Sequence, residues 1–261
     1  MSAPLIEARA LSKRFTRRGI AIWALQEITL QVAPGEFVAL VGPSGCGKST
    51  LLNLVAGLIE PTTGTLLYRG APVHGPNTRV GYLTQTDSLL PWRTVADNVG
   101  LALEIRGVQA RERHAAVQRQ LALVGLAGFE RAYPAELSGG MRKRASLAQT
   151  LIYDPETLLM DEPFGALDAQ LKLLLQQQLL DVFDRSRKTI LFVTHDLAEA
   201  VALADRVIVF TSRPGRIKLD APIPLPRPRD VFQIRFTPEF GRLYETLWTA
   251  LEGEITKGEA V

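Results

Sequence analysis

The chain has 261 residues, of which 46% are hydrophobic and 22% are charged, an ordinary composition for a globular protein with a sizeable core. Its 30 basic and 27 acidic residues leave a net charge of +3, which is too balanced to indicate a nucleic-acid partner. No run approaches the roughly eighteen apolar residues that span a bilayer, the N-terminus lacks the layout of a signal peptide, and the single cysteine excludes an internal disulfide. These features predict a soluble protein of a reducing compartment.

Short apolar runs separated by turn residues dominate the first third of the chain. The basic segment 13–19 is predicted to be a polar loop that exposes one aromatic side chain, Phe15. An exposed ring of this kind either makes only a contact on the protein surface or stacks on the base of a bound nucleotide. The apolar runs themselves predict strands at residues 6–11, 24–32, 37–41, 65–69 and 79–83.

A glycine-rich turn follows the third of these strands and leads into apolar residues at helical spacing. It carries the full phosphate-loop pattern, Gly42-x-x-x-x-Gly47-Lys48-Ser49, in the strand–loop–helix context that the pattern requires. The glycines let successive N–H groups converge on a phosphate, Lys48 supplies a positive charge, and the Ser49 hydroxyl is a hard ligand for Mg²⁺. An ordinary glycine-rich loop would not need this spacing, so we predict that the chain binds ATP through Gly42, Pro43, Ser44, Gly45, Cys46, Gly47, Lys48, Ser49 and Thr50.

The only cysteine, Cys46, lies inside this phosphate loop. Because it neighbours a lysine and the start of a helix, its thiol could be reactive. The alternative is that Cys46 is a small filler residue that the chemistry does not need.

After Gln85 the pattern becomes helical until Asp154-Pro155, which predicts a helical insert with helices at 95–105, 111–124 and 138–152. Beyond it, predicted strands at 157–160, 189–193 and 206–210 alternate with helices at 168–183 and 197–204. This alternation predicts an α/β fold with a mainly parallel sheet between helices. Residues 221–230 are predicted to be a proline-rich connector, followed by a helix at 238–251 and a frayed tail from Glu252.

Several polar residues stand directly after predicted strands, where parallel sheets form their ligand crevice. Asp161 and Glu162 end the strand at 157–160; we predict that Asp161 holds Mg²⁺ and that Glu162 is the general base for the attacking water. Strand-end acids often only cap the next helix, but a phosphate loop upstream favours the catalytic interpretation. Gln85 could contribute an oxygen to Mg²⁺ or to the attacking water, and His195 could contact the γ-phosphate.

The helix at 138–152 begins with a second feature that could bind an anion. Ser138 suits an N-cap, and Gly139 and Gly140 expose backbone N–H groups beside the positive helix end. The plain interpretation is a capped helix start, whereas the functional one is a γ-phosphate site. Two phosphate-binding helix ends in one chain imply that each meets a different molecule's nucleotide, or that a dimer encloses it.

Taken in order, these motifs resemble the ATP-binding subunit of ABC transporters over about residues 4–215. Phe15 matches the family's aromatic loop, residues 42–50 match the Walker A motif and Gln85 matches the Q-loop. Residues 137–141 match the signature motif and residues 158–162 match the Walker B motif. Asp168 matches the D-loop and His195 matches the switch histidine. The resemblance implies a P-loop NTPase (ABC ATPase) fold, with a mainly parallel core sheet, an antiparallel β subdomain and a helical insert. It divides the chain into an ATPase domain at 4–222, with a helical subdomain at about 86–154, and a C-terminal extension at 223–261.

The resemblance also implies cofactors and partners. Two ATP molecules with Mg²⁺ would lie in a head-to-tail homodimer, each held by Lys48 of one copy and faced by Ser138, Gly139, Gly140 and Asp168 of the other. Integral membrane permease subunits would dock on residues 89–93, expected to be an exposed apolar surface, and a periplasmic or lipid-anchored binding protein would choose the solute. Such a subunit lies at the cytoplasmic face of the inner membrane as a peripheral protein, with no nucleic acid bound.

Within the family, residues 90–99 (LPWRTVADNV) and 212–217 (SRPGRI) look like importers for nitrate, taurine and aliphatic sulfonates. The chain departs from the commonest pattern at Met141, where Gln is usual, and at Gln149 and Thr150; the basic run 142–144 fits a solvated face.

The alternative is a non-transport ABC ATPase that acts on nucleic acid or ribosomes. Such proteins usually carry coiled coils, zinc modules or a second ATPase domain, none of which this sequence contains.

Overall fold

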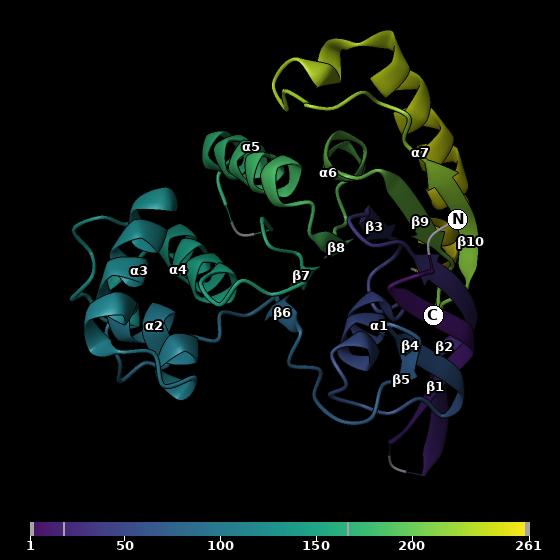
Figure 1. The fold of residues 1–261 in the computed structure, drawn as a ribbon. Coiled ribbons are helices and arrows are strands. Elements are labelled where there is room, and N and C mark those ends of the chain that lie inside the picture. Colours follow the sequence, from purple (N-terminus) through teal and green to yellow (C-terminus); the bar gives the residue numbers. More distant parts are fainter. Residues whose placement is uncertain (1–2, 18, 166, 259–261) are drawn as a thin grey trace.

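Two β-sheets form the body of the molecule in the computed structural model, which describes residues 3–17, 19–165 and 167–258 (Figure 1). The larger sheet has six strands, all parallel to their neighbours except the edge strand β10, which runs antiparallel to β9. Its strands lie in the order β10 (Ile217–Pro222), β9 (Arg206–Phe210), β3 (Phe37–Val41), β8 (Thr189–Val193), β7 (Thr157–Asp161) and β6 (Val80–Leu83).

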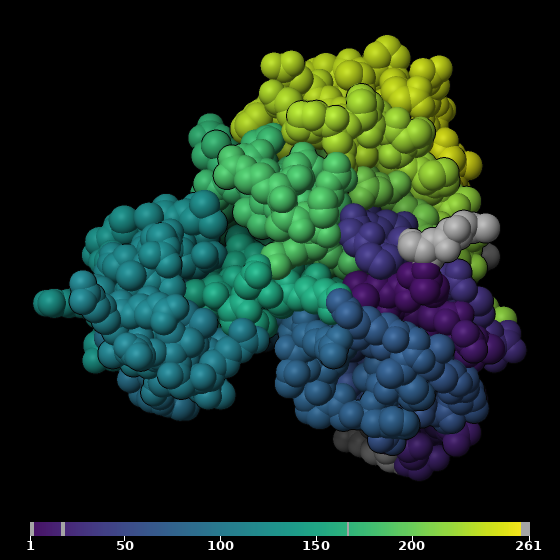
Figure 2. Space-filling model, viewed as in Figure 1, coloured from purple at the N-terminus to yellow at the C-terminus, as the bar shows by residue number. Residues whose placement is uncertain are grey.

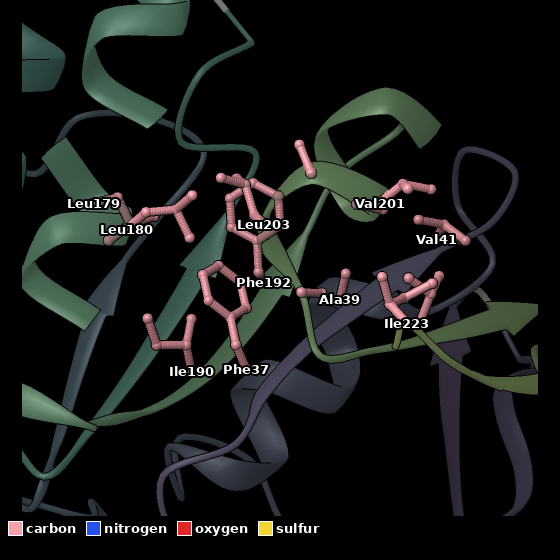
Figure 3. Packing of buried hydrophobic residues seen from close by; sticks show 14 of the residues in the cluster. Phe37, Ala39, Val41, Leu179, Leu180, Ile190, Phe192, Val201, Leu203 and Ile223 are labelled. Atoms are coloured by element: carbon pink, nitrogen blue, oxygen red, sulfur yellow. The ribbon is translucent and has the colours of Figure 1, made fainter. Parts of the chain in front are cut away.

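The central strands β3, β7 and β8 are buried along their whole length, and their middle residues are apolar because both faces of the sheet are covered. In β3, Phe37 and Ala39 point into the core beneath α5 (Ala169–Ser186) and α6 (Leu197–Leu203), whereas Val38 and Leu40 point toward α1 (Lys48–Val55). Figure 3 shows the first of these cores, in which the Phe37 ring meets the Phe192 ring edge-on with 5.8 Å between centroids. Helices on both faces therefore hold the sheet.

The smaller sheet is antiparallel and has the order β2 (Ile20–Val32), β1 (Ile6–Arg17), β4 (Thr63–Tyr68), β5 (Ala71–Pro72). The polar loop predicted at 13–19 is wrong for its first five residues, which continue β1 and pair with β2, with Phe15 opposite Ile22. The segment was not recognised as a strand because Arg14, Phe15 and Thr16 are exposed and the segment lacks an apolar alternation. Residue 18 lies outside the described residues.

The helical insert forms a lobe of its own beside the sheets (Figures 1 and 2). It consists of α2 (Val95–Ile105), α3 (Ala110–Leu123), a 3₁₀ turn (Pro134–Glu136) and α4 (Gly139–Leu151), around a separate apolar core. Leu89 is part of that core, so the expectation that it lies on an exposed contact surface is wrong. Its neighbour Trp92 is 71% exposed, as expected.

The C-terminal segment packs back onto the large sheet. It follows strand β10, which the sequence analysis missed and which includes the first two residues of the predicted connector 221–230. After a short 3₁₀ turn (Ile234–Phe236), helix α7 (Pro238–Gly258) contacts α6, β9 and β10. The predicted fraying from Glu252 is wrong, because the helix runs on and buries the Glu254 carboxylate against Lys218, at 2.8 Å. No helix among the described residues is long and apolar enough to span a membrane.

One buried arginine fastens this segment to α6. The Arg229 side chain is almost fully buried, and its guanidinium donates hydrogen bonds to four backbone carbonyl oxygens, those of Ala202, Ala204, Ile223 and Leu225. Two of these acceptors lie at the C-terminal end of α6, where helix carbonyls lack partners within the helix. Burial lowers the pKa of Arg229 to about 10, which reflects the cost of removing its charge from water.

Replacing Arg229 with methionine would leave these carbonyl groups buried without a donor. We expect Arg229→Met to lower the free energy of unfolding by about 2–4 kcal/mol, measured by urea denaturation. The control is Arg242→Met on α7, which removes an exposed ion pair with Glu239 and should change stability by less than about 0.5 kcal/mol. Equal effects of the two substitutions would contradict the assigned role of Arg229.

Candidate nucleotide-binding site

The phosphate loop joins β3 to α1 and is shaped by its glycines. Gly45 and Gly47 have φ angles of 73° and 107°, in the left-handed region that side chains disfavour. A Cβ atom on Gly47 would lie 2.7 Å from the carbonyl oxygen of Ala24, so β2 also approaches the loop too closely for any side chain. The loop therefore needs glycine for its turn and for its packing.

Lys48 is folded back into this loop. Its amino group donates hydrogen bonds to the carbonyl oxygens of Gly42, at 2.8 Å, and Pro43, at 2.9 Å, and the residue is 6% exposed. These bonds direct two loop carbonyls toward the cation and hold the ammonium group inside the ring of backbone. An anion entering the loop would meet this charge together with the N-terminus of α1.

Asp161 and Ser49 lie together beneath the loop. The Asp161 carboxyl is buried at the end of β7 and is hydrogen-bonded to the Ser49 side chain. Burial raises the pKa of Asp161 above its ordinary value, while the Ser49 hydrogen bond and the charge of Lys48 act in the opposite direction. A hydroxyl beside a carboxylate is a donor set that fits Mg²⁺, which takes few protein oxygens and keeps waters and phosphates as its other ligands. The described residues contain no cluster of three His, Cys, Asp or Glu that would hold a metal unaided.

Three other predicted residues converge beside this pair. Gln85 follows β6, Glu162 follows β7 and His195 follows β8, so the parallel strands deliver all three to one edge of the sheet. The Gln85 Nε2 group donates to Glu162 Oε2 at 3.2 Å, and His195 Nδ1 lies 3.4 Å from the same oxygen. The structure thus brings together the side chains predicted to act at the γ-phosphate.

The backbone at Glu162 is unusual for a residue with a side chain. Its φ angle is 48°, in the left-handed region. Two hydrogen bonds hold it there, from its own N–H to the Val193 carbonyl (3.0 Å) and from the Gly165 N–H to its carbonyl (3.2 Å). Such conformations persist only where the surroundings determine them, and they gather at functional sites.

A cleft of about 430 Å³ runs across these elements. Phe15 and Ile22 of the small sheet line it, together with Gln85, Glu162 and the phosphate loop. Phe15 is 43% exposed and comes from β1 rather than from a loop. The cleft thus combines apolar side chains that fit a base with a cationic, glycine-rich loop that fits phosphates.

The signature residues lie outside this cleft. Ser138 caps α4 by accepting a hydrogen bond from the Met141 N–H, and Asp168 caps α5 by accepting one from the Leu171 N–H, at 2.9 Å. A Cβ atom on Gly140 would touch the Leu167 and Leu171 side chains, so the two helix starts lie against each other. Ser138, Gly139 and Asp168 are exposed, which leaves both N-termini open to another molecule.

The basic run after the signature is not a solvated face, contrary to expectation. Lys143 is 8% exposed, and its amino group donates to the carbonyl oxygens of Thr84 and Gln85, while Arg142 pairs with Asp87 at 3.1 Å. Burial lowers the pKa of Lys143. Long basic side chains can bury their stems and place their heads on backbone carbonyls, which residue type alone does not reveal. Helix α4 is therefore bonded directly to the segment that carries Gln85.

Sequence reasoning assigned no site role to Arg213, yet this residue also lines the cleft. Its Nε and Nη2 groups donate to the Gly45 carbonyl oxygen at 3.1 and 2.9 Å. The signal that could have found it is the SRPGRI segment after β9, which was recognised only as a subgroup resemblance.

Comparison with known proteins identifies the family. The ABC transporter family matches residues 25–165. An ABC transporter ATP-binding protein of Methanocaldococcus jannaschii is 48% identical over 252 residues, which cover 97% of this chain and 93% of that protein. The chain belongs to the ABC transporter family. It is one of the family's ATPases, and the predicted fold class is confirmed.

Two further relatives and one solved structure place this ABC ATPase more closely. The nitrate import ATP-binding protein NrtD of Synechocystis is 42% identical, over 97% of both chains. The aliphatic sulfonates import ATP-binding protein SsuB 2 of Burkholderia cenocepacia is 47% identical, over 88% of this chain and 82% of that protein. The ATP-binding cassette MJ0796, solved as a dimer in a post-hydrolysis state with ADP and Pi, is 28% identical with a TM-score of 0.77, over 84% of this chain and 98% of that chain.

In this ABC ATPase the Cys46 side chain fills space behind the phosphate loop. It is 1% exposed and belongs to the apolar core that includes Leu51 and Phe210. Burial raises the pKa of the Cys46 thiol, although the nearby Lys48 charge opposes the effect. These features favour the filler interpretation over a reactive thiol.

The native protein should accordingly resist thiol reagents. We expect a disulfide reagent such as DTNB, at pH 8, to label the folded chain about 100-fold more slowly than the chain in denaturant. Because Cys46 is the only cysteine, the absorbance change reports on this one thiol. Fast labelling of one thiol per folded chain would contradict the filler interpretation.

Proposed function

We propose that this ABC ATPase energises the import of a small solute by binding and hydrolysing ATP between two copies of itself. The observation that carries the proposal is the meeting of Gln85, Glu162 and His195 beside the phosphate loop of one cleft. Supporting it, two relatives that align with most of the chain are named as import ATP-binding proteins.

The hydrolytic roles follow from the geometry of Glu162. Gln85 and His195 both lie against Oε2, so that oxygen is held in place and Oε1 remains to accept a proton from water. Lys48 and the loop N–H groups would bind the phosphates and keep the γ-phosphorus in line with that water. Asp161, Ser49 and Gln85 would hold Mg²⁺, which would supply positive charge beside the phosphates.

A homodimer would complete the site. The exposed helix starts at Ser138 and Asp168 have no role in their own cleft, and the one at Ser138 presents N–H groups that suit a phosphate. The solved MJ0796 cassette is a dimer that holds ADP and Pi. We infer that Ser138, Gly139 and Gly140 of one copy cover the γ-phosphate bound by Lys48 of the other, with Asp168 along the same interface and Phe15 against the adenine.

The assigned base can be tested by a nearly isosteric substitution. Glu162→Gln should lower ATP turnover about 100-fold or more, because general-base catalysis contributes at least that factor, while ATP binding is retained. ATP should then trap the variant as a dimer, measured by gel filtration with light scattering. Lys48→Ala is the contrasting variant and should weaken ATP binding itself. Unchanged turnover in Glu162→Gln would refute the role of Glu162.

The importer assignment includes partners and location. We infer that the helical lobe docks on integral membrane permease subunits at the cytoplasmic face of the inner membrane, through the surface around Trp92. That ring is 71% exposed, and Pro91 beside it is also exposed. Buried aromatic anchors of this kind supply most of the affinity of many interfaces.

A periplasmic or lipid-anchored binding protein would select the solute, for which nitrate, a sulfonate such as taurine or a related small molecule is the best-supported class.

Copurification from native membranes tests this assignment. The tagged chain should bring down an integral membrane protein, and Trp92→Ala should weaken that association about tenfold or more without changing the ATPase activity of the isolated chain. Trp248→Ala on α7, where the ring is 44% exposed, is the matched control and should have no effect. Recovery of ribosomes or DNA in place of a membrane protein would overturn the importer assignment and favour the non-transport alternative.

A further inference from the structure

The turn between β9 and β10, residues 211–216, lies against the outside of the phosphate loop and has no role in the motifs described so far. It is a well-ordered hydrogen-bonded turn: the Thr211 N–H donates to the Arg216 carbonyl, and the Thr211 hydroxyl donates to the Pro214 carbonyl, both at 3.0 Å. It is also bonded to β2, because the Gly215 N–H donates to the Ala24 carbonyl at 3.0 Å. The turn is thus fixed on a strand of the small sheet.

Gly215 brings this turn into direct contact with the phosphate loop. A Cβ atom at this position would lie 2.0 Å from the Cys46 carbonyl oxygen, a separation that no side chain allows. Gly215 itself is buried. The backbone of the turn and the backbone of the loop therefore pack directly on each other.

Arg213 adds a specific bond to this contact. Two guanidinium nitrogens donate to the carbonyl oxygen of Gly45, the loop residue with a left-handed backbone. Since Lys48 binds the carbonyl oxygens of Gly42 and Pro43, two cations together bind three carbonyl oxygens of the loop. A carbonyl oxygen that is bonded to a cation repels a nearby phosphate less than a free one does, so these bonds favour anion binding in the loop.

The Arg213 cation can also act on a ligand directly. Its side chain lines the cleft, and within the described ranges its third nitrogen, Nη1, has no hydrogen-bond partner. A guanidinium beside a triphosphate contributes attraction that salt screens.

The C-terminal helix supports the turn from its far side. Glu254 of α7, which is 5% exposed, accepts hydrogen bonds from the Ser212 N–H at 3.0 Å and from the Ser212 hydroxyl at 3.2 Å. Lys218 of β10 pairs with the same carboxylate at 2.8 Å. Helix α7 is thus linked to Gly45 by the hydrogen bonds of Glu254 to Ser212 and of Arg213 to Gly45, since Ser212 and Arg213 are adjacent in the chain.

We propose that Arg213 is a positioning residue of the nucleotide site, which holds the phosphate loop in its binding conformation and adds a positive charge beside the phosphates. The inference rests on the proposed nucleotide site and extends it to a turn and a C-terminal helix outside its motifs. The class of ligand it favours is a nucleoside di- or triphosphate, because both place phosphates in the loop that Gly45 helps to form.

Calorimetric titration of the full chain with MgADP, which avoids turnover, tests the proposal. Arg213→Met should raise the Kd about tenfold, since it removes a charge and two hydrogen bonds, and Arg213→Lys, which keeps the charge, about threefold. Arg216→Met is the control, because Arg216 belongs to the same turn but pairs with Glu27 on the surface, and its Kd should equal that of the unaltered protein. Lys48→Ala should bind MgADP very weakly.

Two readouts distinguish positioning from a structural role. Without nucleotide, Arg213→Met should melt within about 2 °C of the unaltered protein, and its Kd should depend less on salt than that of Arg213→Lys. A Kd for Arg213→Met within about twofold of the unaltered value would overturn the proposal, whereas failure of the unaltered protein to bind MgADP would instead overturn the proposed function.

Discussion

The burial of the three central parallel strands on both faces is the constraint on which the site depends. Because β3, β7 and β8 lie in register between two helical layers, their carboxyl ends reach the same edge of the sheet. The phosphate loop, the Asp161–Glu162 pair and His195 follow these ends directly. A slip of one residue in β7 would move the Leu159 side chain to the opposite face of the sheet. It would also turn Asp161 away from Ser49. The packing of Phe37, Phe192 and the other core side chains therefore fixes the relative positions of the site residues.

Much of the site could be predicted from sequence because its motifs are local. A phosphate loop is a continuous segment, and an apolar run that ends in two acids describes β7 and its edge without reference to any distant residue. Strand and helix positions in the core also followed, since period and composition agree there. The same reasoning failed at residues 13–17, where the pairing with β2 rather than a buried face makes the strand.

The sequence could not predict the contacts that long side chains make with residues far away in the chain. Lys143 was interpreted as part of a solvated face, yet it reaches the carbonyls before the insert; Arg213 reaches a loop that precedes it by 168 positions. Glu254 was placed in a frayed tail although its carboxylate is buried against Ser212 and Lys218. In each case the acceptor or donor partner is a backbone group or a distant charge, and no periodic pattern marks it. Lys143 and Glu254 are buried charges, which need partners, and only the folded chain shows what those partners are.

The position of Lys143 bears on how two sites in one chain could communicate. Helix α4 begins at the exposed Ser138 and, one turn later, bonds the carbonyl oxygen of Gln85, whose side chain bonds Glu162. In the proposed dimer, a displacement of α4 caused by the partner's nucleotide would therefore move the Gln85 amide that contacts Glu162, the proposed general base of this copy's own site. Coupling between the two ligand positions requires that α4 be held differently in the two bound states, and the size of the coupling depends on how large that difference is.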